Sequence, residues 1–72
     1  MARKNGTGDL RGALIDCRAT LELSLREVGE AVGLSQAAVS NIERGLAQPR
    51  RTTRIRLLVF LRQRGYTVEE VA

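Results

Sequence analysis

Residues 23–45 read LSLREVGEAVGLSQAAVSNIERG, and the fold is decided within this stretch. Ser24 and Glu27 have the spacing of a capping box, in which each side chain satisfies a free amide group of the first helical turn. Gly33 stands where a helix can end in a left-handed residue, which costs little without a side chain. The stretch therefore begins with a predicted helix from Ser24 that ends in a three-residue turn centred on Gly33.

A second helix is predicted over residues 35–45, where Ser35 can cap its start and Gly45 can end it. Placed on a wheel at about 100° per residue, this helix has two distinct faces. One face is apolar and should point to the core: Val39, Ile42 and Leu46. The opposite arc, roughly 140° wide by the same rotation, carries small and amide side chains: Gln36, Ala37, Ser40, Asn41 and Arg44.

The side-chain types on this outer arc are those that read DNA bases. Gln and Asn can pair with adenine through two hydrogen bonds, Ser can bond to several bases, and Ala can touch the thymine methyl group. The alternative is an ordinary solvated face, but such a face usually carries Glu and Lys rather than Ala, Ser and Asn. Two short helices joined by a turn with a central Gly are the helix-turn-helix pattern, whose second helix enters the major groove.

The segments on either side also read as helices. From Asp9, apolar residues recur at helical spacing, which predicts a first helix whose inner face is Leu10, Leu14, Cys17 and Leu21. Cys17 is interpreted as a core residue, the alternative being a reactive thiol. Pro49 separates the helix 35–45 from a fourth helix, capped by Thr52 or Thr53 and ended at Gly65.

The chain of 72 residues is long enough for one domain, with one Tyr, one Phe and no Trp. A second capping box, Thr67 and Glu70, predicts a last helical turn, so we expect an all-α bundle of about five short helices over residues 9–72. Residues 1–8 have no apolar periodicity and are predicted to form a flexible basic arm. Such an arm can reach around a duplex, or it can be a terminus without a role.

The charge of the chain is unevenly distributed. The net charge is +4, and residues 50–64 contain six arginines and no acidic residue. A basic surface attracts polyanions, of which nucleic acid is the commonest, although the same arginines could serve only solubility. The charge is therefore consistent with a DNA-binding domain and does not prove one.

Composition argues against several other classes of protein. With no His and a single Cys, the chain has no internal disulfide and no ordinary zinc or haem site, so we expect no cofactor and no metal. It has no phosphate-binding Gly loop and no pair of carboxylates framed by a cleft, so we expect no enzyme. No small-molecule ligand is evident. The longest apolar run is too short to span a membrane, which predicts a cytoplasmic protein.

The stretch 23–45 resembles the phage Cro and repressor family, also called XRE-like. The resemblance includes Glu43-x-Gly45 followed by three variable residues and Pro49, Arg18 ahead of Ser24, and the closing stretch 65–71, GYTVEEV. It covers most of residues 14–71. It implies a lambda-repressor-like fold and a sequence-specific transcription regulator, most simply a phage-type repressor or Cro-like switch. Such a protein would bind a double-stranded DNA operator as a homodimer and associate with the nucleoid of a prokaryotic host.

By this resemblance, functions can be carried to individual positions. Family members touch bases or the adjoining backbone from the positions of Gln36, Ala37, Ser40 and Asn41. The phosphate-contacting candidates are Arg26, Arg44, Arg50 and Arg51. Arg18 and Glu43 stand where the family often has a structural ion pair between its first and third helices.

The chain departs from the family pattern at three positions. Leu25 replaces a Gln that anchors a phosphate, Gly29 replaces a small Ala, and Gly65 lies about three residues late relative to Pro49. Because Gly65 lies late, the position of the fourth helix along the sequence is the part of the chain that fits the family pattern least well.

The fourth helix contains five consecutive apolar residues, 57–61, after Ile55. Apolar side chains would then surround most of this helix, and we expect part of them to form a homodimer interface through Leu57, Phe60 and Leu61. The alternative is a complete internal core. A second functional class also stays open, an antitoxin or antirepressor that binds another protein through this helix and the tail.

Overall fold

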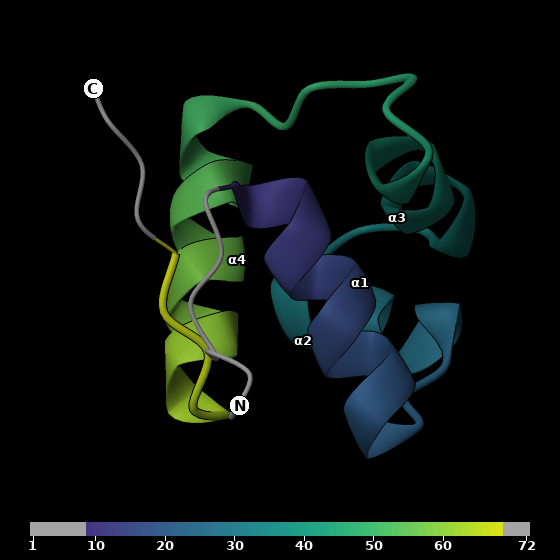
Figure 1. Cartoon of the computed structure of the whole chain (residues 1–72). Coiled ribbons are helices and arrows are strands. Elements are labelled where there is room, and N and C mark those ends of the chain that lie inside the picture. Colours follow the sequence, from purple (N-terminus) through teal and green to yellow (C-terminus); the bar gives the residue numbers. More distant parts are fainter. Residues whose placement is uncertain (1–8, 69–72) are drawn as a thin grey trace.

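The computed structural model describes residues 9–68 and consists of four helices (Figure 1). Their bounds are α1 (Leu10–Leu21), α2 (Leu25–Val32), α3 (Gln36–Glu43) and α4 (Arg51–Gln63). The all-α prediction is confirmed, but the described part of the chain has four helices and not five. Thr67 is not helical, and the predicted partner in its capping box, Glu70, lies outside the described residues, as does the predicted arm 1–8.

Helix α1 starts at a capped residue and buries the predicted face. Asp9 is the N-cap, and its carboxylate accepts a hydrogen bond of 2.7 Å from the amide of Gly12. Leu10, Leu14 and Cys17 are buried as predicted, so Cys17 is a core residue. Leu21 was expected on the same face but is 44% exposed. It is the last residue of α1, and Leu23, beyond the left-handed Glu22, packs against the core instead.

Helix α2 has the capping box that the sequence predicts. The Ser24 hydroxyl accepts a hydrogen bond from the Glu27 amide (2.9 Å), and the Glu27 carboxylate accepts one from the Ser24 amide (2.7 Å). Gly33 ends the helix in the left-handed conformation (φ 77°). Ser35 then caps α3 by accepting a hydrogen bond of 3.1 Å from the Ala38 amide.

Helix α3 ends earlier than predicted. Its last residue is Glu43, followed by Arg44 as C-cap and by Gly45 in the left-handed conformation. Leu46 was predicted on the inner face of this helix, but it lies beyond the helix and is 65% exposed. The Gly signal therefore marks the turn after the helix rather than its last residue.

Helix α4 begins at Arg51, with Arg50 as an N-cap that makes no side-chain cap bond, so Thr52 and Thr53 lie inside the helix instead of capping it. Its apolar run divides between core and surface. The predicted interface residues Leu57, Phe60 and Leu61 are buried, at 0%, 5% and 0% exposure, so that prediction is wrong. Phe60 and Leu61 lie three and four residues after Leu57, so the three side chains share one side of the helix and point to the core.

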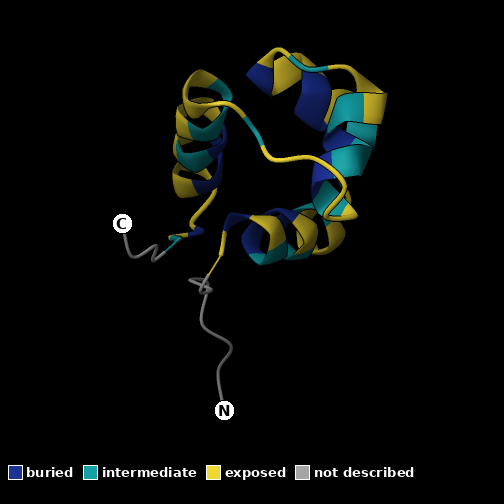
Figure 2. Ribbon diagram, turned by 90° about the horizontal axis from the view of Figure 1, so that it is seen from above, coloured by how far each residue is buried: buried dark blue, intermediate teal, exposed yellow. Residues whose placement is uncertain are grey.

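The core forms where the four helices face one another, and Figure 2 shows the buried surfaces of the helices turned toward the centre. It contains Leu10, Ala13, Leu14, Cys17, Val28, Val32, Val39, Ile42, Leu57, Phe60, Leu61 and Tyr66. Every helix contributes to this cluster, so α2 and α3 are held against α1 and α4 by apolar packing. None of the helices between residues 9 and 68 is long and apolar enough to span a membrane.

Candidate nucleic-acid interface

The predicted base-reading residues lie on the outward side of α3. Gln36 and Ala37 are exposed in its first turn, and Ser40 and Asn41 are half-buried one turn later. Because they stand at positions i, i+1, i+4 and i+5, the helical repeat places all four on one side. The opposite side is fixed in the core by Val39 and Ile42, so the polar side is presented in one defined orientation.

The contact between α2 and the turn before α3 depends on a missing side chain. A Cβ atom added to buried Gly29 would collide with the carbonyl oxygen of Leu34. The two residues are also joined by a hydrogen bond of 2.8 Å, which the amide of Leu34 donates to the carbonyl of Gly29. Gly29 therefore allows the close approach that sets the geometry of the helix-turn-helix.

Leu25 stands where the resemblance to the Cro and repressor family implies a phosphate-binding Gln. It is half-buried and packs against the core. Its side chain adds apolar area to the start of α2 and has no polar group for a phosphate. In this structure Leu25 therefore has a role in packing.

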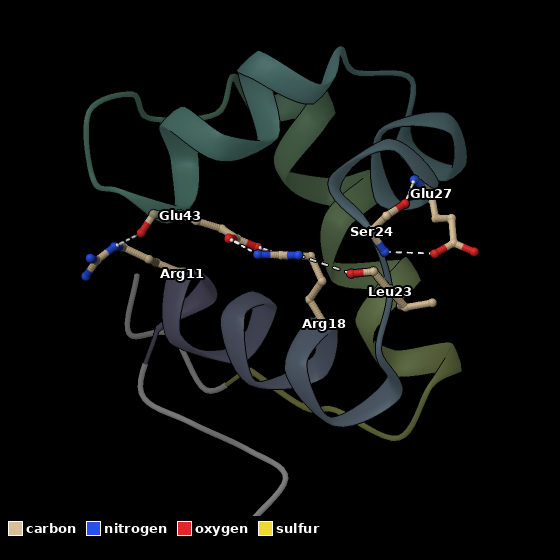
Figure 3. A network of polar contacts seen from close by, with 6 residues as sticks. All are labelled: Arg11, Arg18, Leu23, Ser24, Glu27 and Glu43. Carbon is tan, nitrogen blue, oxygen red and sulfur yellow. Dashed lines mark hydrogen bonds and ion pairs between the residues drawn. The ribbon is translucent and has the colours of Figure 1, made fainter.

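Arg18 and Glu43 form an ion pair that joins α1 to the last residue of α3 (Figure 3). The guanidinium donates two parallel hydrogen bonds to the carboxylate, at 2.7 Å and 3.0 Å, and a third, at 3.1 Å, to the carbonyl of Leu23. The Glu43 side chain is only 10% exposed. The hydrogen bond with Glu43 raises the pKa of Arg18, outweighing the opposite effect of burial. The geometry is that of a strong bidentate pair.

A second arginine of α1 reaches the same residue through its backbone. Arg11 Nε donates a hydrogen bond of 2.5 Å to the main-chain carbonyl of Glu43 (Figure 3). Our sequence reasoning missed Arg11. The available signal was its separation of seven residues from Arg18, because residues two turns apart share a helix face.

The predicted phosphate-contacting arginines are all exposed, and they lie at helix ends. Arg44 is the C-cap of α3, while Arg50 and Arg51 begin α4, so these three lie at the two ends of the loop that joins the helices (Figure 1). Arg26 lies apart from them in the first turn of α2 and pairs with Glu30 at 3.2 Å. Both side chains of that pair are about 70% exposed, which leaves it weak.

Residues 9–68 hold no group of three or more His, Cys, Asp or Glu side chains that could bind a metal ion. The polar groups on the outward side of α3 are amides and a hydroxyl, and exposed arginines lie at both ends of the α3–α4 loop. These groups bind by hydrogen bonding and charge.

Comparison with known proteins identifies the family. The sequence model of the helix-turn-helix family matches residues 14–62, which is more than half of the chain and includes α2, α3 and the turn between them. No curated protein and no solved structure matches the chain. The chain therefore belongs to the XRE-type helix-turn-helix family of DNA-binding transcription regulators.

Proposed function

We propose that this protein is a repressor or Cro-like switch that recognises a short operator through α3. The observation that carries the proposal is the outward side of α3, where Gln36, Ala37, Ser40 and Asn41 share one face and no acidic residue interrupts them. Amide and hydroxyl groups on a rigid helix can read the donor and acceptor pattern of base edges in the major groove.

In this mechanism affinity and specificity come from different residues. The arginines around the α3–α4 loop supply phosphate contacts, which release counterions and make binding sensitive to salt. Such contacts position the protein without reading sequence. Specificity then falls to α3, and above all to Gln36, the exposed amide in its first turn.

The direct test is Gln36→Ala, measured by equilibrium titration on the DNA sequence that the wild-type chain binds best in a selection from a random pool. We expect the variant to lose about 1 to 3 kcal/mol of discrimination at one or two base pairs, while its affinity for random DNA stays close to that of the wild type. Gln63→Ala is the matched control, because Gln63 is also an exposed amide but lies at the end of α4. If Gln36→Ala keeps full affinity and selectivity, α3 is not the reading helix.

We further propose that the protein binds its operator as a homodimer, with α3 of each copy in one of two half-sites about one helical turn apart. The apolar residues available on the surface of α4 are Ile55 and Val59, at 51% and 47% exposure, in place of the buried residues expected from sequence. They are four residues apart and so lie on one side of the helix.

Sedimentation at micromolar concentration tests the dimer, with and without operator DNA. We expect two chains per operator, and we expect Val59→Asp to lower the apparent affinity of the second chain because it places a charge among apolar contacts. Leu46→Asp is the control, since Leu46 is also exposed but lies in the α3–α4 loop. One chain per operator at saturation would refute the dimer.

A further inference from the structure

We propose that Arg11 is a positioning residue for the recognition helix, holding the C-terminal end of α3 in place from α1. This inference rests on the proposed function, since it assigns a role in base reading to a residue that need not touch DNA. It starts from the shortness of α3, which spans eight residues and has no basic residue in its last turn. The last four carbonyl groups of a helix have no partners within the helix, and its C-terminal end carries partial negative charge.

Arg11 supplies what that helix end lacks. Its Nε donates the 2.5 Å hydrogen bond to the carbonyl of Glu43, the last residue of α3, across a separation of 32 residues in sequence. A Cβ added to Gly45 would lie 3.6 Å from Arg11 Nε and 3.8 Å from Cζ, so the guanidinium also lies beside the left-handed turn after the helix. The hydrogen bond satisfies a free carbonyl at this end of the helix.

Arg11 and Arg18 together fix Glu43 at two points. Arg18 binds its carboxylate and Arg11 binds its carbonyl, and both arginines project from the same face of α1 (Figure 3). Core packing of Val39 and Ile42 sets the orientation of α3, and the contacts of the two arginines to different atoms of Glu43 limit fraying of its last turn. Because Ser40 and Asn41 lie within the last turn of α3, their placement depends on this anchor.

The hydrogen bonds that close this end of α3 give a readout that does not need DNA. The amides of Arg44, Gly45 and Leu46 donate to carbonyls of Ser40, Ile42 and Asn41 at 2.9, 3.1 and 2.8 Å. If Arg11 holds this end, its loss opens these three bonds locally and speeds their hydrogen exchange. The amide of Val28 in α2, which donates to the carbonyl of Ser24, serves as the reference: its exchange rises only if the whole fold has loosened.

Two variants separate the hydrogen bond from the charge. In Arg11→Gln, the side-chain nitrogen is attached to Cδ, as Arg Nε is, so the donor to Glu43 is retained while the positive charge is lost. Arg11→Met has similar length, no charge and no donor. We expect exchange at the three amides to rise about two- to tenfold in Arg11→Met, the range for loss of one hydrogen bond, and to stay within about twofold of wild type in Arg11→Gln.

The DNA measurement uses the same pair, titrated on the selected operator and on random DNA of equal length. We expect Arg11→Met to lower the ratio of the two affinities by about two- to tenfold, and Arg11→Gln to preserve it. Equal effects of both variants on exchange and on the ratio would overturn the proposal. The proposal would also be overturned if Arg11→Met reduced the slope of log affinity against log salt concentration by about 0.9 and left the ratio of the two affinities unchanged. That result indicates that Arg11 contacts a phosphate directly. If the wild type does not distinguish operator from random DNA, the proposed function fails, and the exchange comparison still decides whether Arg11 anchors α3.

Discussion

At the scale of single residues, Cys17 shows how burial is coupled to proton binding. It is fully buried in the core, and this burial raises the pKa of its thiol because the charged thiolate is poorly solvated there. The unfolded chain therefore releases this proton at lower pH than the folded chain does. The free energy of unfolding should then fall as the pH rises above about 8.5, the ordinary thiol value, by at most about 1.4 kcal/mol per pH unit.

This prediction is checked by urea unfolding of the wild type and Cys17→Ala at pH 7 and at pH 9.5. Other groups also titrate in this interval, so the difference in pH dependence between the two proteins is the quantity of interest. We expect the wild type to lose more stability than the variant, and we expect a thiol reagent to react slowly until the chain unfolds. Parallel losses in both proteins would mean that the thiol ionises as easily in the fold as outside it.

Single residues also show where sequence reasoning succeeds. The bonds of Ser24, Glu27 and Ser35 join residues three apart, so their types and spacing were enough to predict the caps. The bond from Arg11 to Glu43 spans 32 residues and ends on a backbone carbonyl. No residue type marks a carbonyl as an acceptor, so this contact became visible only in the folded chain.

At the scale of elements, the turn between α2 and α3 depends on Gly33. Its φ of 77° is left-handed, a conformation that costs a residue with a Cβ about 1 to 2 kcal/mol. A Cβ here would meet the flexible end of Arg56 at 3.0 Å, and that side chain can move away. We therefore expect Gly33→Ala to lower the free energy of unfolding by about 1 to 2 kcal/mol, and Gly33→Asn by less, since Asn tolerates this conformation.

Gly65→Ala is the control for this series. Gly65 has a similar φ of 87°, and nothing lies within 4 Å of an added Cβ. Denaturant unfolding should give similar losses for the two Ala variants if backbone conformation alone is responsible. A Gly33→Ala variant as stable as the wild type would show that the turn does not need its left-handed residue.

Helix starts were better predicted than helix ends and surfaces. The N-caps of α2 and α3 make local side-chain bonds. The N-cap of α4, Arg50, makes none, and the two threonines predicted a start slightly later than the actual one at Arg51. The apolar run of α4 predicted that this helix is buried, but it could not show which side faces the core. Leu57, Phe60 and Leu61 look the same in sequence as Ile55 and Val59, and only packing against α1 and α2 separates them.

At the scale of the whole molecule, one side of α3 packs into the core and the opposite side faces outward. All four helices share one core, which presents α3 as a rigid element, and the segment from residue 50 to residue 64 carries six arginines. The fold class, the family and the position of the helix-turn-helix could be predicted because they follow from local patterns. Operator sequence and pairing of copies could not, because they depend on groups outside the chain.

The most direct measurement is a selection of double-stranded DNA from a random pool by the unmodified chain, followed by sequencing of the bound fraction. If α3 reads base edges, the bound DNA will contain an enriched motif, and if the protein binds as a dimer the motif will be palindromic with half-sites about one helical turn apart. Bound DNA with no enriched motif would contradict recognition by α3 and leave only phosphate binding by the arginines.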